Sequence, residues 1–267
     1  MLVRILTALV LAPVAIALTL MPPTAWFGAF LAVVMLLGLW EWKQISGASP
    51  AGYLTGALVI AGFAWWGPRH PILLIPVVVM AALVWILLVY DLKRFGLKSA
   101  WPALTTFAAG VFLLTGAWSA LVLLHQGSES GPLIALAAMS VVWAADSFAF
   151  FSGKQFGRNK LAPELSPGKT VEGVVGGLAG AVLVAALFAI LGMDLATDDV
   201  RFWVWTGAAA AAALTSVAGD LYQSRLKRIA GLKDSGSLLP GHGGILDRID
   251  GLIAAMPVFY CTWYWGT

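Results

Sequence analysis

The polar residues between Asp220 and Asp250 have the types and spacing needed for chemistry. In the stretch DLYQSRLKRIAGLKDSGSLLPGHGGILDRID lie four of the thirteen acidic residues, five of the sixteen basic residues and one of the three histidines. The chain as a whole is 60% hydrophobic and only 11% charged. Charge gathered in one stretch of such an apolar chain favours a site that binds charged groups.

The carboxylates of this stretch are spaced to hold a metal-bound phosphate. If the apolar run before Asp220 continues as a helix, the polar residues that recur on one face of it are Asp220, Ser224, and Lys227 or Arg228. Asp247 and Asp250 are three residues apart and open the next predicted helix. Carboxylate oxygens are the ligands that Mg²⁺ prefers, together with water and substrate phosphate oxygens.

A glycine-rich segment, residues 240–244 with the sequence PGHGG, lies between these carboxylates. Glycines have no side chain that would keep a phosphate away from the backbone N–H groups, and such loops bind anions. We therefore expect acidic, basic and anion-binding groups to meet at one place.

The order of residue types then carries a family resemblance. The fixed positions are Ser224-x-Leu226-Lys227-Arg228, Lys233-Asp234, and Leu239-Pro240-Gly241-His242-Gly243-Gly244-x-x-Asp247-Arg248-x-Asp250. This pattern resembles the C-terminal motif of the phosphatidate cytidylyltransferase family, whose members are also called CDP-diacylglycerol synthases.

A second stretch is similar to the other shared segment of that family. It comprises Asp146-Ser147-x-Ala149-Phe150-Phe151-x-Gly153, Lys160-Leu161-Ala162-Pro163, and Leu165-Ser166-Pro167-Gly168-Lys169-Thr170-Val171-Glu172-Gly173. The departures are Ser147 and Val171, where the resemblance leads us to expect threonine and tryptophan. The residues before this stretch match only as generic membrane helices.

The resemblance implies transfer of the cytidylyl group of CTP to phosphatidate, with CDP-diacylglycerol and pyrophosphate as products. It implies Mg²⁺ as cofactor and leaves a second cation open. Asp220 and Asp247 are the expected principal ligands, with Asp250 assisting and Asp146 completing the site. The groups expected to hold or orient phosphates are Lys169, Arg225, Lys227, Arg228, Lys233, Arg248, Ser166, Ser224, His242, Gly243 and Gly244.

Composition indicates an all-α polytopic membrane protein. The mean hydropathy is +0.89, the chain has thirteen tryptophans, and apolar runs approach the roughly 20 residues that cross ~30 Å of hydrocarbon. The single cysteine, Cys261, excludes an internal disulfide, and no His/Cys cluster has zinc spacing. We expect the lipid bilayer as a partner and no nucleic acid; a homodimer stays open.

We predict nine transmembrane segments. They are Ile5 to Leu20, Thr24 to Trp40, Gly52 to Trp66, Pro71 to Tyr90, Trp101 to Leu124, Pro132 to Phe151, Val171 to Met193, Phe202 to Ala218, and Ile249 to Trp265. The first could instead be a cleaved signal peptide, because Arg4 precedes an apolar core. Residues 1–131 then hold five spans, and residues 132–267 form a catalytic part with cytoplasmic motif loops 152–170 and 219–248.

Basic residues set the predicted orientation. With the N-terminus in the cytoplasm and the C-terminus outside, fourteen of the sixteen basic residues fall on the cytoplasmic side, and only Arg69 and Arg201 fall outside. Both motif loops then face the CTP pool, in a membrane of the bacterial inner-membrane type. On this topology His70 and His125 lie in outer loops, and we interpret them as solvated.

Two features inside the predicted spans need an interpretation. A carboxylate within a membrane helix costs about 2.5 to 3.5 kcal/mol on insertion scales, so Asp146 faces a cavity or a structural ion-pair partner. The glycines that recur in the seventh span favour close packing against another helix; they are Gly173, Gly176, Gly177 and Gly180.

Two other protein classes share part of this pattern. A secondary transporter would also place an acid such as Asp146 at mid-membrane, but gives no reason for a long run of mixed charge. A membrane prenyltransferase would use aspartates and Mg²⁺ for a diphosphate, yet Asp247 and Asp250 stand in Asp-Arg-Ile-Asp beside His-Gly-Gly rather than in two aspartate-rich repeats.

Overall fold

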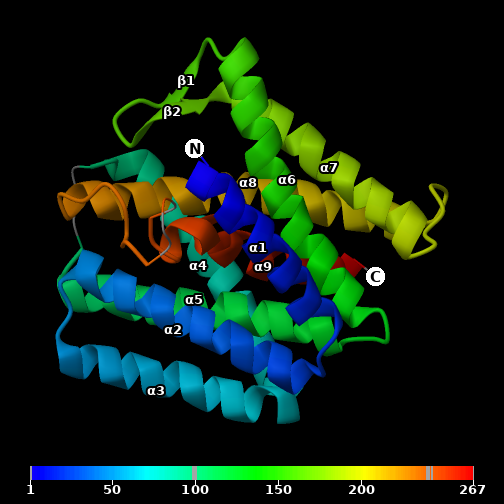
Figure 1. Ribbon diagram of the computed structural model, residues 1–267, viewed down its shortest axis with the longest axis horizontal. Helices are drawn as coiled ribbons and strands as arrows, with labels where there is room; N and C mark the ends of the chain where they lie inside the picture. Colours follow the sequence, from blue (N-terminus) through cyan, green and yellow to red (C-terminus); the bar gives the residue numbers. More distant parts are fainter. Residues whose placement is uncertain (1, 98–100, 239–240, 242, 267) are drawn as a thin grey trace.

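The computed structural model describes residues 2–97, 101–238, 241 and 243–266, which form nine α-helices and one β-hairpin (Figure 1). The helices are α1 (Leu2–Leu20), α2 (Thr24–Ser46), α3 (Pro50–Trp66), α4 (Leu74–Phe95), α5 (Ala103–Gln126), α6 (Gly131–Phe156), α7 (Val171–Gly192), α8 (Val200–Ile229) and α9 (Leu246–Gly266). Strands β1 (Lys160–Ala162) and β2 (Ser166–Thr170) pair antiparallel between α6 and α7.

Each of the nine predicted spans coincides with one of these helices. Six helices, α2 and α4 to α8, are long and apolar enough to cross a membrane, α4 together with the short 3₁₀ turn that precedes it. The expectation of a helical membrane protein is therefore confirmed, with one short β-hairpin added. Nine crossings and the direction of the two termini stay predictions.

The polar loops are shorter than the sequence predicts, because helices α6 and α8 continue into them. Helix α8 has 30 residues, about 45 Å at 1.5 Å per residue, and runs through the first eleven residues, 219–229, of predicted loop 219–248. Helix α6 likewise includes residues 152–156. The polar turn of α8 that carries Asp220 is therefore rigid helix and not loop.

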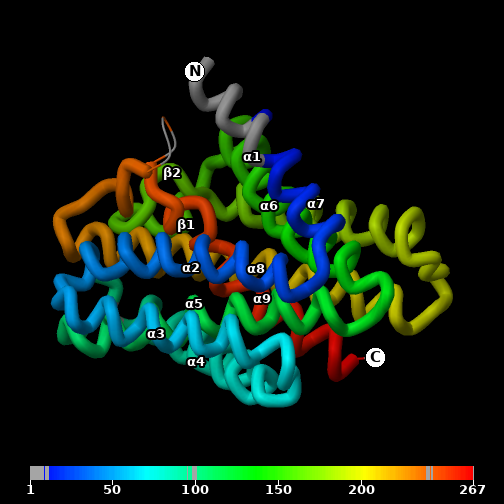
Figure 2. The backbone as a smooth tube through the Cα atoms, turned by 60° about the horizontal axis from the view of Figure 1, so that its bottom comes forward, coloured from blue at the N-terminus to red at the C-terminus, as the bar shows by residue number. Residues whose placement is uncertain are grey.

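Helix α9 lies at the centre of the bundle, where it packs against α2, α4, α5, α6 and α8 (Figure 1). Figure 2 shows α3 on the edge of the molecule, beside α2 and α5. Buried tryptophans join these helices, because an indole N–H without water needs a protein acceptor. Trp85 of α4 donates to the Ile253 carbonyl of α9 at 3.1 Å, and Trp205 of α8 donates to the Ala185 carbonyl of α7 at 2.9 Å.

The glycine face of α7 packs directly on α6, as its spacing predicts. A Cβ atom on Gly177 would lie 2.7 Å from the backbone oxygen of Ala145, and one on Gly173 would lie 2.9 Å from that of Ala149. Any larger residue at these positions would push the two helices apart. Because α6 carries Asp146 and α7 follows strand β2, this contact fixes one wall of the site described below.

The interpretation of His125 as a solvated residue is wrong. Its ring is buried at the end of α5, with Nε2 2.9 Å from the Thr19 carbonyl oxygen and Nδ1 2.9 Å from the Thr24 hydroxyl. Phe27 stacks on the ring at 4.3 Å. Its position near a predicted outer loop hid this role, because the partners come from α1 and α2. His70 is exposed, as expected.

Candidate active site

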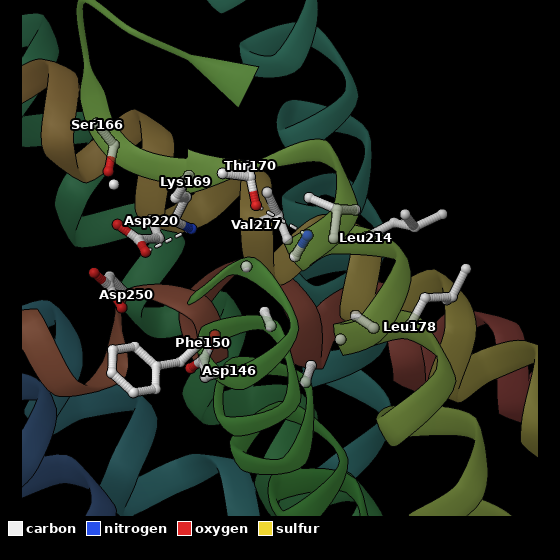
Figure 3. A pocket seen from close by; sticks show the side chains of 18 of the residues that line it. Asp146, Phe150, Ser166, Lys169, Thr170, Leu178, Leu214, Val217, Asp220 and Asp250 are labelled. Atoms are coloured by element: carbon white, nitrogen blue, oxygen red, sulfur yellow. Dashed lines mark hydrogen bonds and ion pairs between the residues drawn. The ribbon is translucent and has the colours of Figure 1, made fainter. Parts of the chain in front are cut away.

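A cavity of about 600 Å³ opens between α6, β2, α7, α8 and the start of α9. One wall is polar and the opposite wall is apolar, the latter formed by residues such as Leu178, Leu214 and Val217 (Figure 3). Both motif stretches contribute to the polar wall. The sequence-predicted site residues that line the cavity are Asp146, Ser166, Lys169, Asp220, Lys227, Asp247, Arg248 and Asp250.

Asp220 and Lys169 face each other across the polar wall. The Lys169 Nζ atom of β2 lies 2.6 Å from Asp220 Oδ2, and the two side chains are 23% and 32% exposed. Figure 3 shows this ion pair, with Ser166 beside it on the same strand. The Ser224 hydroxyl, one turn further along α8, donates to the other oxygen of Asp220 at 3.3 Å. This carboxylate therefore has a fixed orientation but stays open to a ligand.

Asp247 makes more contacts within the protein than Asp220 does. Its Oδ1 atom lies 2.6 Å from Lys227 Nζ, and its Oδ2 atom accepts the backbone N–H groups of Ser235 at 2.9 Å and Gly244 at 3.0 Å. Asp247 precedes the apolar part of α9 that begins at Ile249. Burial would raise the pKa of Asp247, but the hydrogen bonds from Lys227, Ser235 and Gly244 outweigh it, and the pKa lies below its ordinary value.

Two further carboxylates reach the same cavity from different helices. Figure 3 shows Asp250 of α9 close to Asp220, with Asp146 of α6 below them. The charge of Asp220 acts on both of them, and the charge of Asp146 acts on Asp250. The Gly251 N–H donates to Asp250 at 2.8 Å. The intramembrane acid Asp146 thus faces a cavity, one of the two environments expected for it.

The chemistry of these donors suits Mg²⁺. Within the described ranges no three acidic, histidine or cysteine side chains converge closely enough to hold a metal ion by themselves. Mg²⁺ does not need such a cage, because it usually takes one or two carboxylates and completes its shell with water and substrate phosphates. Asp220 and Asp250, which lie near each other on the polar wall, fit that requirement.

Arg225 is not at the cavity, although the sequence pattern predicts a phosphate contact for it. Its side chain is 3% exposed and forms an ion pair with Asp91 of α4. Tyr222, one turn earlier on α8, packs edge-on against Trp85 of the same helix α4. Spacing on a helix does not tell which face a neighbouring helix will cover. Arg225 therefore joins α8 to α4 and leaves the set of candidate phosphate ligands.

Other predicted residues also lie away from the cavity lining. Arg228 and Lys233 are exposed at the end of α8 and beyond it. His242 lies outside the described residues. Gly243 has a φ of +82°, which explains why glycine stands there, and the N–H of Gly244 is donated to Asp247. For Gly244 we therefore correct the expectation that the segment leaves its N–H groups open to phosphate.

Sequence reasoning missed four residues at or beside the site. Lys154, Thr170 and Asp234 line the cavity, and all three stand in or next to the motif stretches. Glu41 of α2 is fully buried and reaches the segment that precedes α9. The signal for Glu41 was its isolation, because it is the only acidic residue before Asp91 and follows a long apolar run.

Comparison with known proteins agrees with this geometry. The sequence model of the Cytidylyltransferase family matches residues 2–265. A phosphatidate cytidylyltransferase of Pseudomonas aeruginosa is 40% identical over 96% of this chain and 94% of its own length. One of Haemophilus influenzae is 36% identical over 96% of both chains, and one of Thermotoga maritima is 44% identical over 49% of each. The chain therefore belongs to the cytidylyltransferase family.

Proposed function

We propose that this protein transfers the cytidylyl group of CTP to phosphatidate, forming CDP-diacylglycerol and pyrophosphate, at the cytoplasmic face of a bacterial inner membrane. Two relatives that match nearly the whole chain carry the name phosphatidate cytidylyltransferase. The observation that carries the proposal is one cavity in which lysines and aspartates face an apolar wall. Such a cavity suits a substrate that has both a phosphate and acyl chains.

The polar wall accounts for the phosphate chemistry. A phosphate monoester is already largely ionised near neutral pH, with a second pKa of about 6, so no strong general base is required. An oxygen of the phosphatidate phosphate attacks the α-phosphorus of CTP. The bond from that phosphorus to the oxygen that bridges it to the β-phosphorus breaks, and this oxygen leaves as part of pyrophosphate. Lys154, Lys169 and Arg248 line the cavity and offset the negative charge of two polyanions brought together.

We assign the metal ligands by what each carboxylate already contacts. Asp220 and Asp250 would hold Mg²⁺, with Asp146 near them, and the ion would polarise phosphate oxygens as a Lewis acid. Asp247 is a weaker candidate than the sequence suggested, because its two oxygens already accept three hydrogen bonds. Its role is to fix Lys227 and the segment before α9.

The lipid would enter from the apolar side. Leu178 of α7 and the pair Leu214 and Val217 of α8 form that wall, and both helices are long enough to cross a bilayer. Acyl chains held between them stay in apolar surroundings while the phosphate reaches Asp220. Nine crossings with the N-terminus in the cytoplasm remain part of the proposal, supported by the fourteen-to-two distribution of basic residues.

The test is a reaction in detergent. Purified protein, given labelled CTP and phosphatidate, is expected to form CDP-diacylglycerol and pyrophosphate in equal amounts, and to form neither without the lipid. Chelation of divalent cations should abolish turnover and Mg²⁺ should restore it. Full turnover after exhaustive chelation would contradict the metal assignment, and transfer of a prenyl group instead would contradict the function.

A further inference from the structure

Glu41 lies in α2, far in sequence from both motif stretches, and its side chain is fully buried. Its Oε1 atom accepts the backbone N–H of Ile245 at 3.0 Å, and its Oε2 atom accepts that of Leu246 at 2.8 Å. The Ser235 hydroxyl donates to Oε2 at 2.7 Å. Burying a carboxylate costs free energy unless hydrogen-bond donors surround it. Here three donors come from the two ends of the segment 235–246.

Two glycines of that segment leave space for the Glu41 side chain. A Cβ atom on Gly236 would lie 2.5 Å from Glu41 Oε1, and one on Gly244 would lie 2.2 Å from Glu41 Oε2. The nearest atom to the Gly244 Cβ position is the Ser235 hydroxyl oxygen, at 2.1 Å. Two glycines of the motif therefore leave room for a side chain that lies outside it.

Helices α2 and α9 approach closely where Glu41 acts. A Cβ atom on Gly38, one turn before Glu41, would lie 3.3 Å from Ile249 Cδ1 and 3.8 Å from Leu246 Cδ1. The first N–H groups of a helix have no partner within it, and a negative charge beside them is favoured by the helix dipole. Glu41 therefore acts as an N-terminal cap of α9 supplied by another helix.

Asp247 completes the arrangement from the other side. It accepts hydrogen bonds from the N–H groups of Ser235 and Gly244. Glu41 and Asp247 together therefore accept five hydrogen bonds from this segment, four of them from backbone N–H groups. Asp247 lies in the first turn of α9 and Asp250 follows three residues later, and both line the cavity. Their positions thus depend on how the start of α9 is held.

We propose that Glu41 is a positioning residue for cytidylyl transfer, which fixes the start of α9 and so the carboxylates of Asp247 and Asp250. This inference rests on the proposed function. Glu41 does not line the cavity, so its loss should lower the turnover of bound substrates more than their binding.

The first experiment compares Glu41→Gln with Glu129→Gln, a change of an exposed acid in the loop after α5. Glutamine replaces one acceptor oxygen by a donor that faces N–H groups. We expect Glu41→Gln to lower kcat by about tenfold, the scale of one lost hydrogen bond to a charged group. The KM for CTP should change by less than about threefold, and the control should match the wild type.

Hydrogen exchange supplies a readout that does not depend on activity. Peptides that contain Leu246 should exchange their amide hydrogens faster in Glu41→Gln than in the wild type, while peptides from α7 should not change. Unchanged exchange with unchanged kcat would overturn the inference. A wild-type protein that makes no CDP-diacylglycerol would instead overturn the proposed function, whatever the exchange shows.

A double-mutant cycle tests the contact itself. Gly236→Ala places a methyl group against the Glu41 carboxylate and should lower kcat. Glu41→Asp shortens the side chain, so the same glycine change should cost clearly less in that background. Equal costs in both backgrounds would show that the two residues act independently and would overturn the inference. If Gly236→Ala cannot be purified, kcat and exchange of Glu41→Gln decide the question.

Discussion

Asp220 and Asp247 differ in how much of their hydrogen-bonding capacity is already used. Asp220 contacts one lysine and one serine hydroxyl and remains about one third exposed. Asp247 is 9% exposed and accepts three hydrogen bonds, one of them from Lys227, whose side chain is 11% exposed. The same substitution at the two positions should therefore have different consequences.

Asp220→Asn should lower kcat by about 10²- to 10³-fold, the scale of one lost electrostatic stabiliser, with little change in melting temperature. Excess Mg²⁺ should restore part of the activity. Asp247→Asn should lower the melting temperature as well, because Lys227 loses a charged partner in a largely buried place. Kinetics across a Mg²⁺ series and thermal unfolding measure both effects, and Asp198→Asn, an exposed position, is the control. Equal melting temperatures for the two variants would refute the distinction.

Lys154 is the cation that the motif pattern did not single out. It lines the cavity from the end of α6, whereas Lys160, on β1, is exposed and does not line it. Lys154→Gln should lower kcat/KM by about tenfold, because one charge-assisted hydrogen bond contributes about 1.5 kcal/mol or more. The loss should appear mainly in KM, and Lys160→Gln should behave as wild type. Steady-state kinetics with CTP and phosphatidate varied in turn would show whether this expectation fails.

Most residues of the polar wall stand in the two motif stretches, whose residue types and order can be recognised without knowing the fold. Residue types and order could not place Arg225, because only the position of α4 shows that Asp91 covers that face of α8. Glu41 was missed for the same reason. Its partners lie about two hundred positions away in sequence.

The α6–α7 pair shows that the packing face of a helix can be predicted from the spacing of its small residues. Glycine spacing indicated a packing face, and the structure places the α6 backbone against it. Helix ends were less predictable, because hydropathy stops at the membrane boundary whereas α8 continues for a further polar stretch. The β-hairpin between α6 and α7 was not expected, since its strands have only three and five residues.

Gly177→Ala tests that packing face. The added methyl group would lie 2.7 Å from a backbone oxygen that cannot rotate away, so we expect a loss of about 1 to 3 kcal/mol in the free energy of unfolding. Gly207→Ala is the matched control in α8, where nothing lies within 4 Å of the new atom. Thermal unfolding in one detergent compares the two. A Gly177→Ala protein as stable as the control would show that α6 and α7 separate easily.

The orientation that the basic residues predict for the whole bundle can be tested directly. In a background without Cys261, a cysteine at Ser237 should be shielded from an impermeant thiol reagent outside intact cells, and one at Ser128 should be labelled. Both positions are exposed, so burial does not decide the result. Labelling at Ser237 from outside would place the site away from the CTP pool, and the orientation would be wrong.

The length of α8 also bears on how deep in the membrane Asp220 lies. Asp220 lies twenty helical steps after Val200, which is about 30 Å along the axis and equals the thickness of the hydrocarbon layer. If α8 begins at the outer surface and crosses upright, Asp220 stands where acyl chains give way to headgroups on the inner side. A phosphatidate molecule would then reach the carboxylate by moving sideways within its own leaflet, and only the nucleotide would have to come from water.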